Sequence, residues 1–191
     1  ACNWNAGSGT NMLVPNMTAA KNPLISALFL PEIMRTGKYM GKDHPIKALY
    51  VYSGNPITNQ VNTNEYLKDI VGNLEFLVTA DYNYSDTVHY SDIVLPACHW
   101  FEAEDIVLLT GAQCYEYNAK AIEPLYESKT DSDILRLLAA GMGYPDLFPL
   151  TDEEYCHKML DTKALAARGI SFDALKEKED IYYKSVEPWI P

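Results

Sequence analysis

The feature that most constrains this chain is a series of three short apolar segments between Ile46 and Trp100. They cover residues 46–52, 75–79 and 93–95, and a helical pattern lies between the first two. This order is typical of a parallel α/β unit, because parallel strands need a crossover connection that is usually a helix. Apolar residues fall on both faces of the first segment, which predicts a strand buried on both sides. Ligands of such sheets bind at the carboxyl ends of the strands, so the turn residues there are the first candidates for function.

The chain has 191 residues, of which 48% are hydrophobic, so it has enough apolar material for a core. Its formal net charge is −11 and its pI is about 4.7. An acidic chain lacks the basic patch that nucleic-acid phosphates require and the polybasic cluster of an anionic-membrane binder. No apolar run approaches the roughly 20 residues of a spanning helix. We therefore expect no nucleic-acid partner and no direct membrane insertion.

Four cysteines are scattered along the chain, at Cys2, Cys98, Cys114 and Cys156. None belongs to a Cys-x-x-Cys pair, and the spacings differ from those of metal sites. The sequence therefore favours isolated thiols over a zinc or iron–sulfur site, and we assign no metal ligand within this chain.

The remaining pattern predicts short helices joined by loops. Helical patterns with caps or apolar stripes lie at residues 31–37, 62–71, after Ser85-Asp86, 130–142, and from Thr151 and Ser171 onward. Residues 1–22 are expected to be loop and residues 37–45 a linker. Residues 102–112 are expected to be irregular, and weak alternation predicts an edge strand over residues 114–121.

These patterns divide the chain into an irregular lead-in with a short helix (1–45), an α/β lobe (46–145) and a helical tail (146–191). The chain begins at Ala1 rather than Met and ends at Pro191 without a closing element. We therefore expect a piece of a longer polypeptide, in which the tail leads to a following domain.

Six short motifs occur in a fixed order between residues 46 and 145. They are Ser53-Gly54-Asn55-Pro56, Thr79-Ala80-Asp81, Ser91-Asp92-Ile93-Val94-Leu95-Pro96 with Trp100 and Glu102, Ala121-Ile122-Glu123-Pro124, Lys129-Thr130-Asp131, and Met142-Gly143-Tyr144-Pro145. Together they resemble the large subunit of the molybdopterin oxidoreductases, the dimethyl sulfoxide reductase superfamily. The chain departs from that pattern at Ala103, where the family often has Lys, and at Ala112, where it often has Arg. These departures remove positive charges that could contact cofactor phosphate at this loop.

The resemblance implies a three-layer αβα Rossmann-like lobe with a parallel sheet, plus a helical C-terminal tail. It also implies a molybdopterin guanine dinucleotide cofactor with molybdenum or tungsten, of which this lobe holds one dinucleotide. The metal ligand and an iron–sulfur cluster are expected upstream of this chain. The parent protein is thus expected to be an oxidoreductase with two-electron or oxygen-atom transfer at the metal, and this chain alone is expected to be non-catalytic.

The resemblance assigns cofactor contacts to Gly54, Asn55, Pro56, Ala80, Asp81 and Asp131. Glycine lets the backbone approach a ligand, asparagine offers donor and acceptor groups, and proline fixes the turn. The two aspartates can accept N–H bonds from a guanine edge or bind a ribose hydroxyl. The ordinary alternatives are a strand-to-helix turn, a turn aspartate and a helix cap. We expect Asn55, Asp81 and Asp131 to lie near one another at the carboxyl edge of the sheet.

The other polar residues of the motifs are interpreted as structural. Asp92 precedes the third apolar segment and Pro96 ends it. His89, His99 and Glu102 are assigned to packing or surface, because a histidine without a paired carboxylate or cysteine is seldom an acid–base group despite its suitable pKa.

Two alternatives remain beside the oxidoreductase. One is a cofactor-free subunit related to the large subunit of respiratory complex I, and the other is a free-standing nucleotide-binding α/β domain. The expected partners are the remaining domains of the same polypeptide, and a further candidate is an electron-transfer protein with iron–sulfur clusters. The sequence does not assign a localisation, and the resemblance is compatible with the cytoplasm or the periplasm of a prokaryote.

Overall fold

The structure, a computed structural model, describes residues 25–109 and 114–182. The loop expected over residues 1–22, Cys2 and the end of the tail lie outside these ranges. The chain forms two compact units. The parallel-sheet unit runs up to Cys98 and includes Tyr126–Asp131, whereas the antiparallel-sheet unit contains His99–Leu125 and the residues from Ser132 onward.

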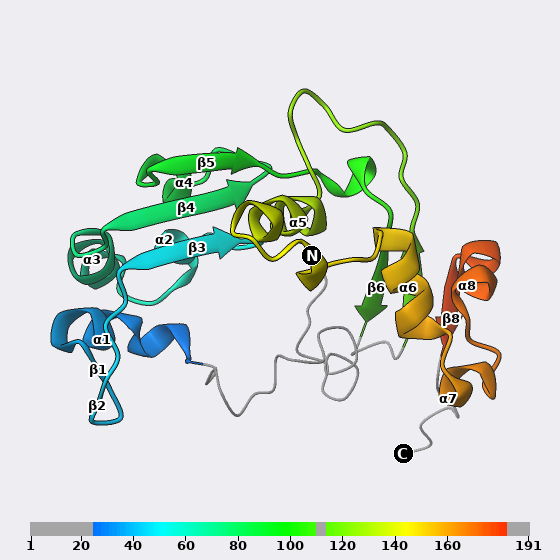
Figure 1. Ribbon diagram of the computed structural model, residues 1–191, viewed down its shortest axis with the longest axis horizontal. Helices are drawn as coiled ribbons and strands as arrows, with labels where there is room; N and C mark the ends of the chain where they lie inside the picture. The colour runs from blue at the N-terminus through cyan, green and yellow to red at the C-terminus, as the bar shows by residue number, and fades with distance from the viewer. Residues whose placement is uncertain (1–24, 110–113, 183–191) are drawn as a thin grey trace, which may run out of the picture. The chain divides into compact units, whose positions relative to one another are not determined.

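Three parallel strands form the sheet of the first unit. They are β3 (Ala48–Tyr52), β4 (Phe76–Asp81) and β5 (Ile93–Pro96), in the order β3-β4-β5. Figure 1 shows their arrows side by side and pointing the same way. The register pairs Leu49 with Leu77 and Thr79 with Val94. The prediction of three adjacent parallel strands is therefore confirmed, with β4 two residues longer than expected at its carboxyl end.

Short helical segments fill the connections of this sheet. They are α2 (Pro56–Asn59), α3 (Thr63–Glu65), the π-helical η3 (Tyr66–Val71) and α4 (Asp86–His89). The helix expected over residues 62–71 is present and begins at its N-cap Asn62, but its second half is π-helical. Ile57, Tyr66 and Ile70 are buried there, and Leu49 of β3 packs against them. These helices thus cover the sheet face that carries Leu49.

The opposite face of the sheet is less buried than the sequence predicted. Phe76, Ile93 and Tyr52 are 41%, 45% and 47% exposed, and the alternation of the strands places all three on that face. On the helix-bearing face Leu77 is 3% exposed and Thr79 is fully buried. The expectation that β3 is buried on both sides is therefore wrong for this chain.

A short helix and a hairpin precede β3. Helix α1 (Leu30–Thr36) follows the 3₁₀ turn η2 (Ala27–Phe29) and ends at Gly37, whose φ of 64° is the left-handed conformation that glycine adopts easily. The predicted linker over residues 37–45 instead contains the antiparallel pair β1 (Lys38–Tyr39) and β2 (Lys42–Asp43). The two residues between these strands have positive φ, at Met40 and Gly41. This pattern is the tight hairpin turn that matches strand twist, and a single Gly was too weak a signal to predict it.

The second unit is built on an antiparallel sheet of β6 (Asp105–Leu109), β7 (Cys114–Asn118) and β8 (Asp180–Tyr182), in that order. The expectation that residues 102–112 are irregular is wrong, because they include β6 and the end of the turn η4 (Trp100–Glu102). Strand β7 is also central rather than an edge strand. Its second partner, β8, lies more than 60 positions later in the chain, so local alternation gave no sign of it.

Helices complete this unit. They are α5 (Asp131–Gly141), whose first residue belongs to the parallel-sheet unit, η5 (Pro145–Leu147), α6 (Asp152–Leu160), α7 (Lys163–Ala166) and α8 (Phe172–Lys178). The expected starts of α6 and α8 are confirmed, because Thr151 forms a capping box with Glu154 and the Ser171 hydroxyl accepts from the Ala174 N–H. The tail expected to be helical also contains β8.

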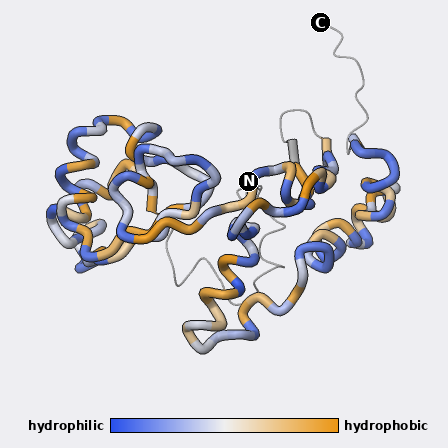
Figure 2. The backbone as a smooth tube through the Cα atoms, turned by 90° about the horizontal axis from the view of Figure 1, so that it is seen from above, coloured by the Kyte–Doolittle hydropathy of each residue, from blue (hydrophilic) through white to orange (hydrophobic). Residues whose placement is uncertain are grey.

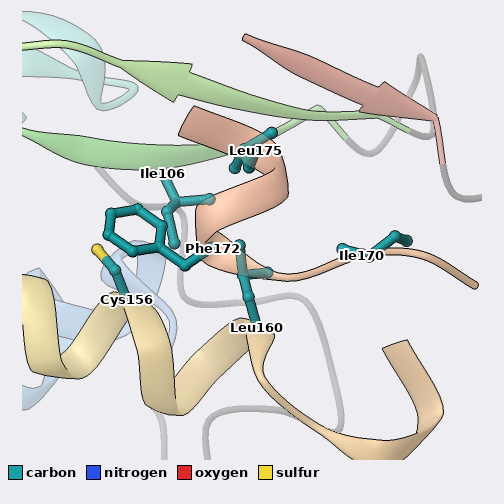
Figure 3. Packing of buried hydrophobic residues seen from close by; sticks show 6 residues of the cluster. All are labelled: Ile106, Cys156, Leu160, Ile170, Phe172 and Leu175. Atoms are coloured by element: carbon teal, nitrogen blue, oxygen red, sulfur yellow. The ribbon is translucent and has the colours of Figure 1, made fainter. Parts of the chain in front are cut away.

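The core of the antiparallel-sheet unit brings α6, β6 and α8 together. Figure 3 shows its six buried residues, Ile106, Cys156, Leu160, Ile170, Phe172 and Leu175. The Phe172 ring lies beside Cys156 and Ile106, and Phe172 is fully buried. Burial, with a smaller effect of nearby carboxylates, raises the pKa of the Cys156 thiol to about 12. Cys156 therefore acts as a packing residue, as an isolated thiol is expected to.

Hydrophobic stretches are short along the whole described chain. Figure 2 shows them interrupted by hydrophilic residues in helices and strands alike. Among the described residues, no helix has the length and apolar character needed to cross a bilayer.

We expect a pH-dependent contribution to stability from His157 and Asp161 at the end of α6. His157 Nδ1 lies 2.7 Å from Asp161 Oδ2, and Asp161 Oδ1 accepts a 3.0 Å bond from the Phe172 N–H. The bond to Asp161 raises the pKa of His157 above its ordinary 6.5. Burial opposes the shift of Asp161, but its bonds to His157 and Phe172 lower its pKa below the ordinary 3.8. The pair is therefore fully charged between these two ordinary values.

The histidine contribution is present below pH 6.5 and is lost as the pH rises through the raised pKa. The aspartate contribution is present above pH 3.8 and is lost as the pH falls through the lowered pKa. Asp161→Asn, which keeps an acceptor for the Phe172 N–H, should therefore lower Tm most near about pH 5 and least near about pH 8. The corresponding loss in the free energy of unfolding should be less than about 1 kcal/mol, because the pair is exposed. Thermal melts against Asp146→Asn, an exposed control, would measure it. A difference independent of pH would contradict the expectation.

Candidate functional site

The carboxyl edge of the parallel sheet collects the residues that the sequence singled out. Strand β3 is followed by Ser53, Gly54 and Asn55, and β4 ends at Asp81. Both strands run in the same direction, so their carboxyl ends meet at one edge. The side chains that follow β3 and β4 therefore lie at the same carboxyl edge of the sheet, as predicted.

Asn55 is tied to helix α4 rather than left open. Its Oδ1 accepts bonds of 3.2 Å from the Thr87 N–H and 2.7 Å from the Thr87 hydroxyl. Its Nδ2 donates to Thr58 Oγ1 at 3.2 Å. Thr87 is 1% exposed, so these bonds satisfy polar groups that water does not reach. Asn55 thus fixes the turn after β3 to the first turn of α4.

Asp81 holds the turn between β4 and α4. Its Oδ1 accepts from the Asn83 N–H at 3.0 Å, and its Oδ2 accepts from the Ser85 hydroxyl at 2.6 Å. The first of these is the turn that aspartate side chains often form with the backbone two residues later. Ser85 is the N-cap residue of α4, as expected, but its hydroxyl serves Asp81 instead of the helix. Each carboxylate oxygen of Asp81 keeps further acceptor capacity.

The segment that leads to Asp131 is hydrogen-bonded beside the end of β5, and it brings Asp131 to this edge of the sheet. The Lys129 N–H donates to Pro96 O at 3.1 Å, and the Cys98 N–H donates to Lys129 O at 2.9 Å. Two residues later, Asp131 Oδ2 accepts from the Ser53 hydroxyl at 3.1 Å. Asp131 therefore lies beside the turn after β3, at the carboxyl edge where it was expected.

Two buried polar atoms near this bond lack a partner. Tyr50 Oη and Asp131 Oδ1 are both buried, and neither has a hydrogen-bond partner among the described residues. Burial, and next the charge of Asp131, raise the pKa of Tyr50. A buried acceptor without a donor is costly, so such atoms in a native protein require an explanation. They mark the polar centre of the candidate site.

The other predicted contacts have mainly backbone roles. Pro56 is the first residue of α2, and Ala80 is 2% exposed within β4. Gly54 does not have a positive φ, and a Cβ there would meet only Tyr52 O at 3.7 Å. The left-handed residue of this turn is Ser53, with φ 52°. The expected close approach of a ligand to the Gly54 backbone stays a prediction.

The residues interpreted as structural have structural partners. Asp92 Oδ2 accepts from the Leu77 N–H at 2.7 Å. Glu102 accepts from the N–H groups of His99 at 2.6 Å and Leu125 at 2.7 Å, and these two bonds lower its pKa. His99 caps η4, and the His89 ring packs edge-on against Tyr84. Within the described ranges, no group of three or more His, Cys, Asp or Glu side chains is placed to hold a metal ion.

Sequence reasoning missed Tyr50, Ser53, Ser85 and Thr87 as members of this site. Ser53 lies within a quoted motif, but the sequence did not show that its hydroxyl would meet a residue 78 positions later. Tyr50 reads as an ordinary apolar strand residue, and its position beside Asp131 depends on the tertiary fold. Thr87 carried no signal, because it follows the expected cap of a short helix.

Comparison with known proteins gives a consistent family. The molybdopterin oxidoreductase family model matches residues 8–140. A putative catalytic subunit of a dimethyl sulfoxide reductase from Halobacterium salinarum is 35% identical over 131 residues, which are 69% of this chain and 15% of that protein. The probable oxidoreductase YyaE of Bacillus subtilis is 30% identical over 184 residues, covering 90% of this chain and 27% of that protein.

A solved structure has a similar fold. Acetylene hydratase from Pelobacter acetylenicus superposes with a TM-score of 0.63 at 24% sequence identity, covering 81% of this chain and 20% of that one. This chain therefore spans between about a seventh and a quarter of the lengths of these proteins. The strand-end motifs, the parallel sheet that carries them and the matched family model agree, and the chain belongs to the molybdopterin oxidoreductase family.

Proposed function

We propose that this chain is a Rossmann-like αβα lobe that holds one molybdopterin guanine dinucleotide of a molybdenum or tungsten oxidoreductase. Family membership supports the molybdopterin cofactor, and the carboxyl-edge cluster of Asn55, Asp81 and Asp131 supports its location on this chain. Open α/β sheets bind their ligands at this edge. The proposed partners are the remaining domains of the parent polypeptide and an electron-transfer protein with iron–sulfur clusters.

The observation that carries the proposal is the unpartnered carboxylate oxygen of Asp131. Guanine presents two adjacent N–H donors, at N1 and N2, and a carboxylate is the natural acceptor for them. Ser53 occupies Oδ2 from one side, while Oδ1 has no donor among the described residues. The residues present thus fit a guanine base, which would satisfy a buried acceptor that the described residues leave unsatisfied.

The remaining residues of the edge have supporting roles in this proposal. Asn55 and Asp81 anchor α4 beside the site, through Thr87 and Ser85. Asp81 keeps acceptor capacity for a ribose hydroxyl, the role of acidic residues in dinucleotide folds. When bound, the cofactor supplies two-electron or oxygen-atom transfer at its metal. The part of this chain is to bind and orient the dinucleotide.

Nucleotide analysis of the purified gene product that carries this sequence tests the proposal. We expect molybdenum or tungsten, together with GMP released by acid hydrolysis of the cofactor. Asp131→Asn should reduce the GMP retained after dialysis, because a charge-assisted hydrogen bond contributes about 1.5–3 kcal/mol, or about 10- to 100-fold in affinity. Asp81→Asn should reduce it less, since both oxygens of Asp81 already bond within the chain.

Asp43→Asn is the matched control, because Asp43 is an exposed aspartate of the β2 hairpin. It should retain the GMP content of the unmodified protein. Metal and pterin without any guanine nucleotide would contradict the dinucleotide part of the proposal. Complete absence of both would favour a cofactor-free subunit related to the large subunit of complex I.

A further inference from the structure

The hydroxyl of Tyr50 is a buried polar group of the parallel-sheet unit. Tyr50 lies in the middle of β3, and its ring stacks on that of Tyr52 with centroids 5.8 Å apart and an interplanar angle of 27°. Its Oη has no hydrogen-bond partner among the described residues. Burial and the nearby Asp131 charge raise its pKa, so the hydroxyl keeps its proton at neutral pH and can donate.

The Ser53 hydroxyl occupies one of the two carboxylate oxygens of Asp131. The left-handed backbone at Ser53, with φ 52°, is unusual for a residue with a side chain, and the Ser53 hydroxyl donates to Asp131 Oδ2. The other oxygen, Oδ1, is left without a partner among the described residues, as is Tyr50 Oη. The described residues therefore include one buried hydroxyl donor and one buried carboxylate acceptor whose hydrogen-bonding capacity is unused.

We propose that Tyr50 is a specificity-determining residue of the nucleotide site, where its hydroxyl donates to the O6 carbonyl of guanine while Asp131 accepts from N1–H and N2–H. This inference rests on the proposed function. The donor and acceptor of the chain match the guanine edge, which presents one acceptor followed by two donors. Adenine presents an amino group in place of O6 and an unprotonated N1, which would face the carboxylate as acceptor against acceptor. We therefore expect the site to reject adenine, because a buried polar group would be left unpaired.

Calorimetric titration of the cofactor-free gene product with GMP, IMP and AMP tests this assignment. IMP keeps O6 and N1–H but lacks the N2 amino group, so it separates the two contacts. The unmodified protein should bind GMP more tightly than IMP and IMP more tightly than AMP. Tyr50→Phe should weaken GMP and IMP by the same factor of about ten, since one hydrogen bond is worth roughly that much. Asp131→Asn should instead reduce the ratio between GMP and IMP.

Tyr52→Phe is the matched control. Tyr52 stacks on Tyr50 but is 47% exposed, so removal of its hydroxyl should change no affinity. Thermal melts distinguish a binding hydroxyl from a structural one. Because the Tyr50 hydroxyl has no partner within the described residues, Tyr50→Phe should leave Tm of the nucleotide-free protein unchanged or raised, while the GMP-induced increase in Tm becomes smaller.

The outcomes separate this inference from the proposed function. If the unmodified protein shows no preference for GMP over AMP, the guanine site itself is wrong. If that preference is present but Tyr50→Phe behaves like Tyr52→Phe, the guanine site stands and the role of Tyr50 is overturned. A loss of Tm in nucleotide-free Tyr50→Phe would also overturn it, because the hydroxyl would then serve the fold.

Discussion

Replacing Asn55 with Ala is expected to lower the free energy of unfolding by about 2–4 kcal/mol, because two bonds to buried donors are lost together and each unsatisfied donor costs about 1–3 kcal/mol. The donors are the N–H and hydroxyl of Thr87, which is 1% exposed. The Thr87 hydroxyl also accepts from the Ile57 N–H at 3.4 Å, so the loss extends to the start of α2. Urea unfolding followed by circular dichroism would measure the change.

Asn59→Ala is the control for this prediction. Asn59 is an exposed residue of the same helix α2, and its substitution should stay within about 0.5 kcal/mol. Hydrogen exchange gives a local measurement as well, since the Thr87 amide should lose protection in Asn55→Ala. An unchanged Thr87 amide together with unchanged stability would show that the Asn55 side chain does not hold α4.

The second large effect is expected in the antiparallel-sheet unit. Phe172→Ala should destabilise the protein by about 3–5 kcal/mol, the usual cost of removing a fully buried aromatic side chain and leaving a cavity. Phe172 is fully buried, and it packs with Cys156 and Ile106 (Figure 3). It also supports the Lys176 ammonium, which lies 4.9 Å from its ring centroid.

Phe101→Ala serves as the comparison, because Phe101 is 61% exposed and its ring lies against the His99 ring, with centroids 5.0 Å apart, rather than in the core. We expect it to cost less than about 1 kcal/mol. Equal losses in the two variants, measured by the same urea titration, would mean that the Phe172 cluster is not the core of its unit.

The sequence predicted best those elements whose signals are local. The strands β3, β4 and β5 are short apolar runs that end in turn residues, and their parallel pairing follows from the helical crossover between them. The starts of α6 and α8 were visible because Thr151 and Ser171 are capping residues within one turn of their partners. The position of Asp131 at the carboxyl edge followed from its motif, whereas its role as a cofactor contact stays a prediction.

The elements that the sequence did not predict depend on distant partners. Strand β7 is central because β8 pairs with it from a position far along the chain. Strand β6 was expected to be irregular. Its apolar run, residues 106–109, does not alternate with polar residues, and periodicity alone does not identify the secondary structure of so short a run. Exposure was also misjudged, since β3 was expected to be buried on both faces although Tyr52 is 47% exposed.

The bond between Asn55 and Thr87 also bears on how the protein folds. It joins residues 32 positions apart, and the chain between them includes the whole of β4. The entropy of closing this loop must be offset before the bond can contribute, and the pairing of β3 with β4 is what brings its ends together. We therefore expect the edge that carries Asn55, Asp81 and Ser53 to form late in folding. On the proposed function, the residues that would contact the nucleotide come together only once the sheet has formed, so we expect cofactor binding to require a folded sheet.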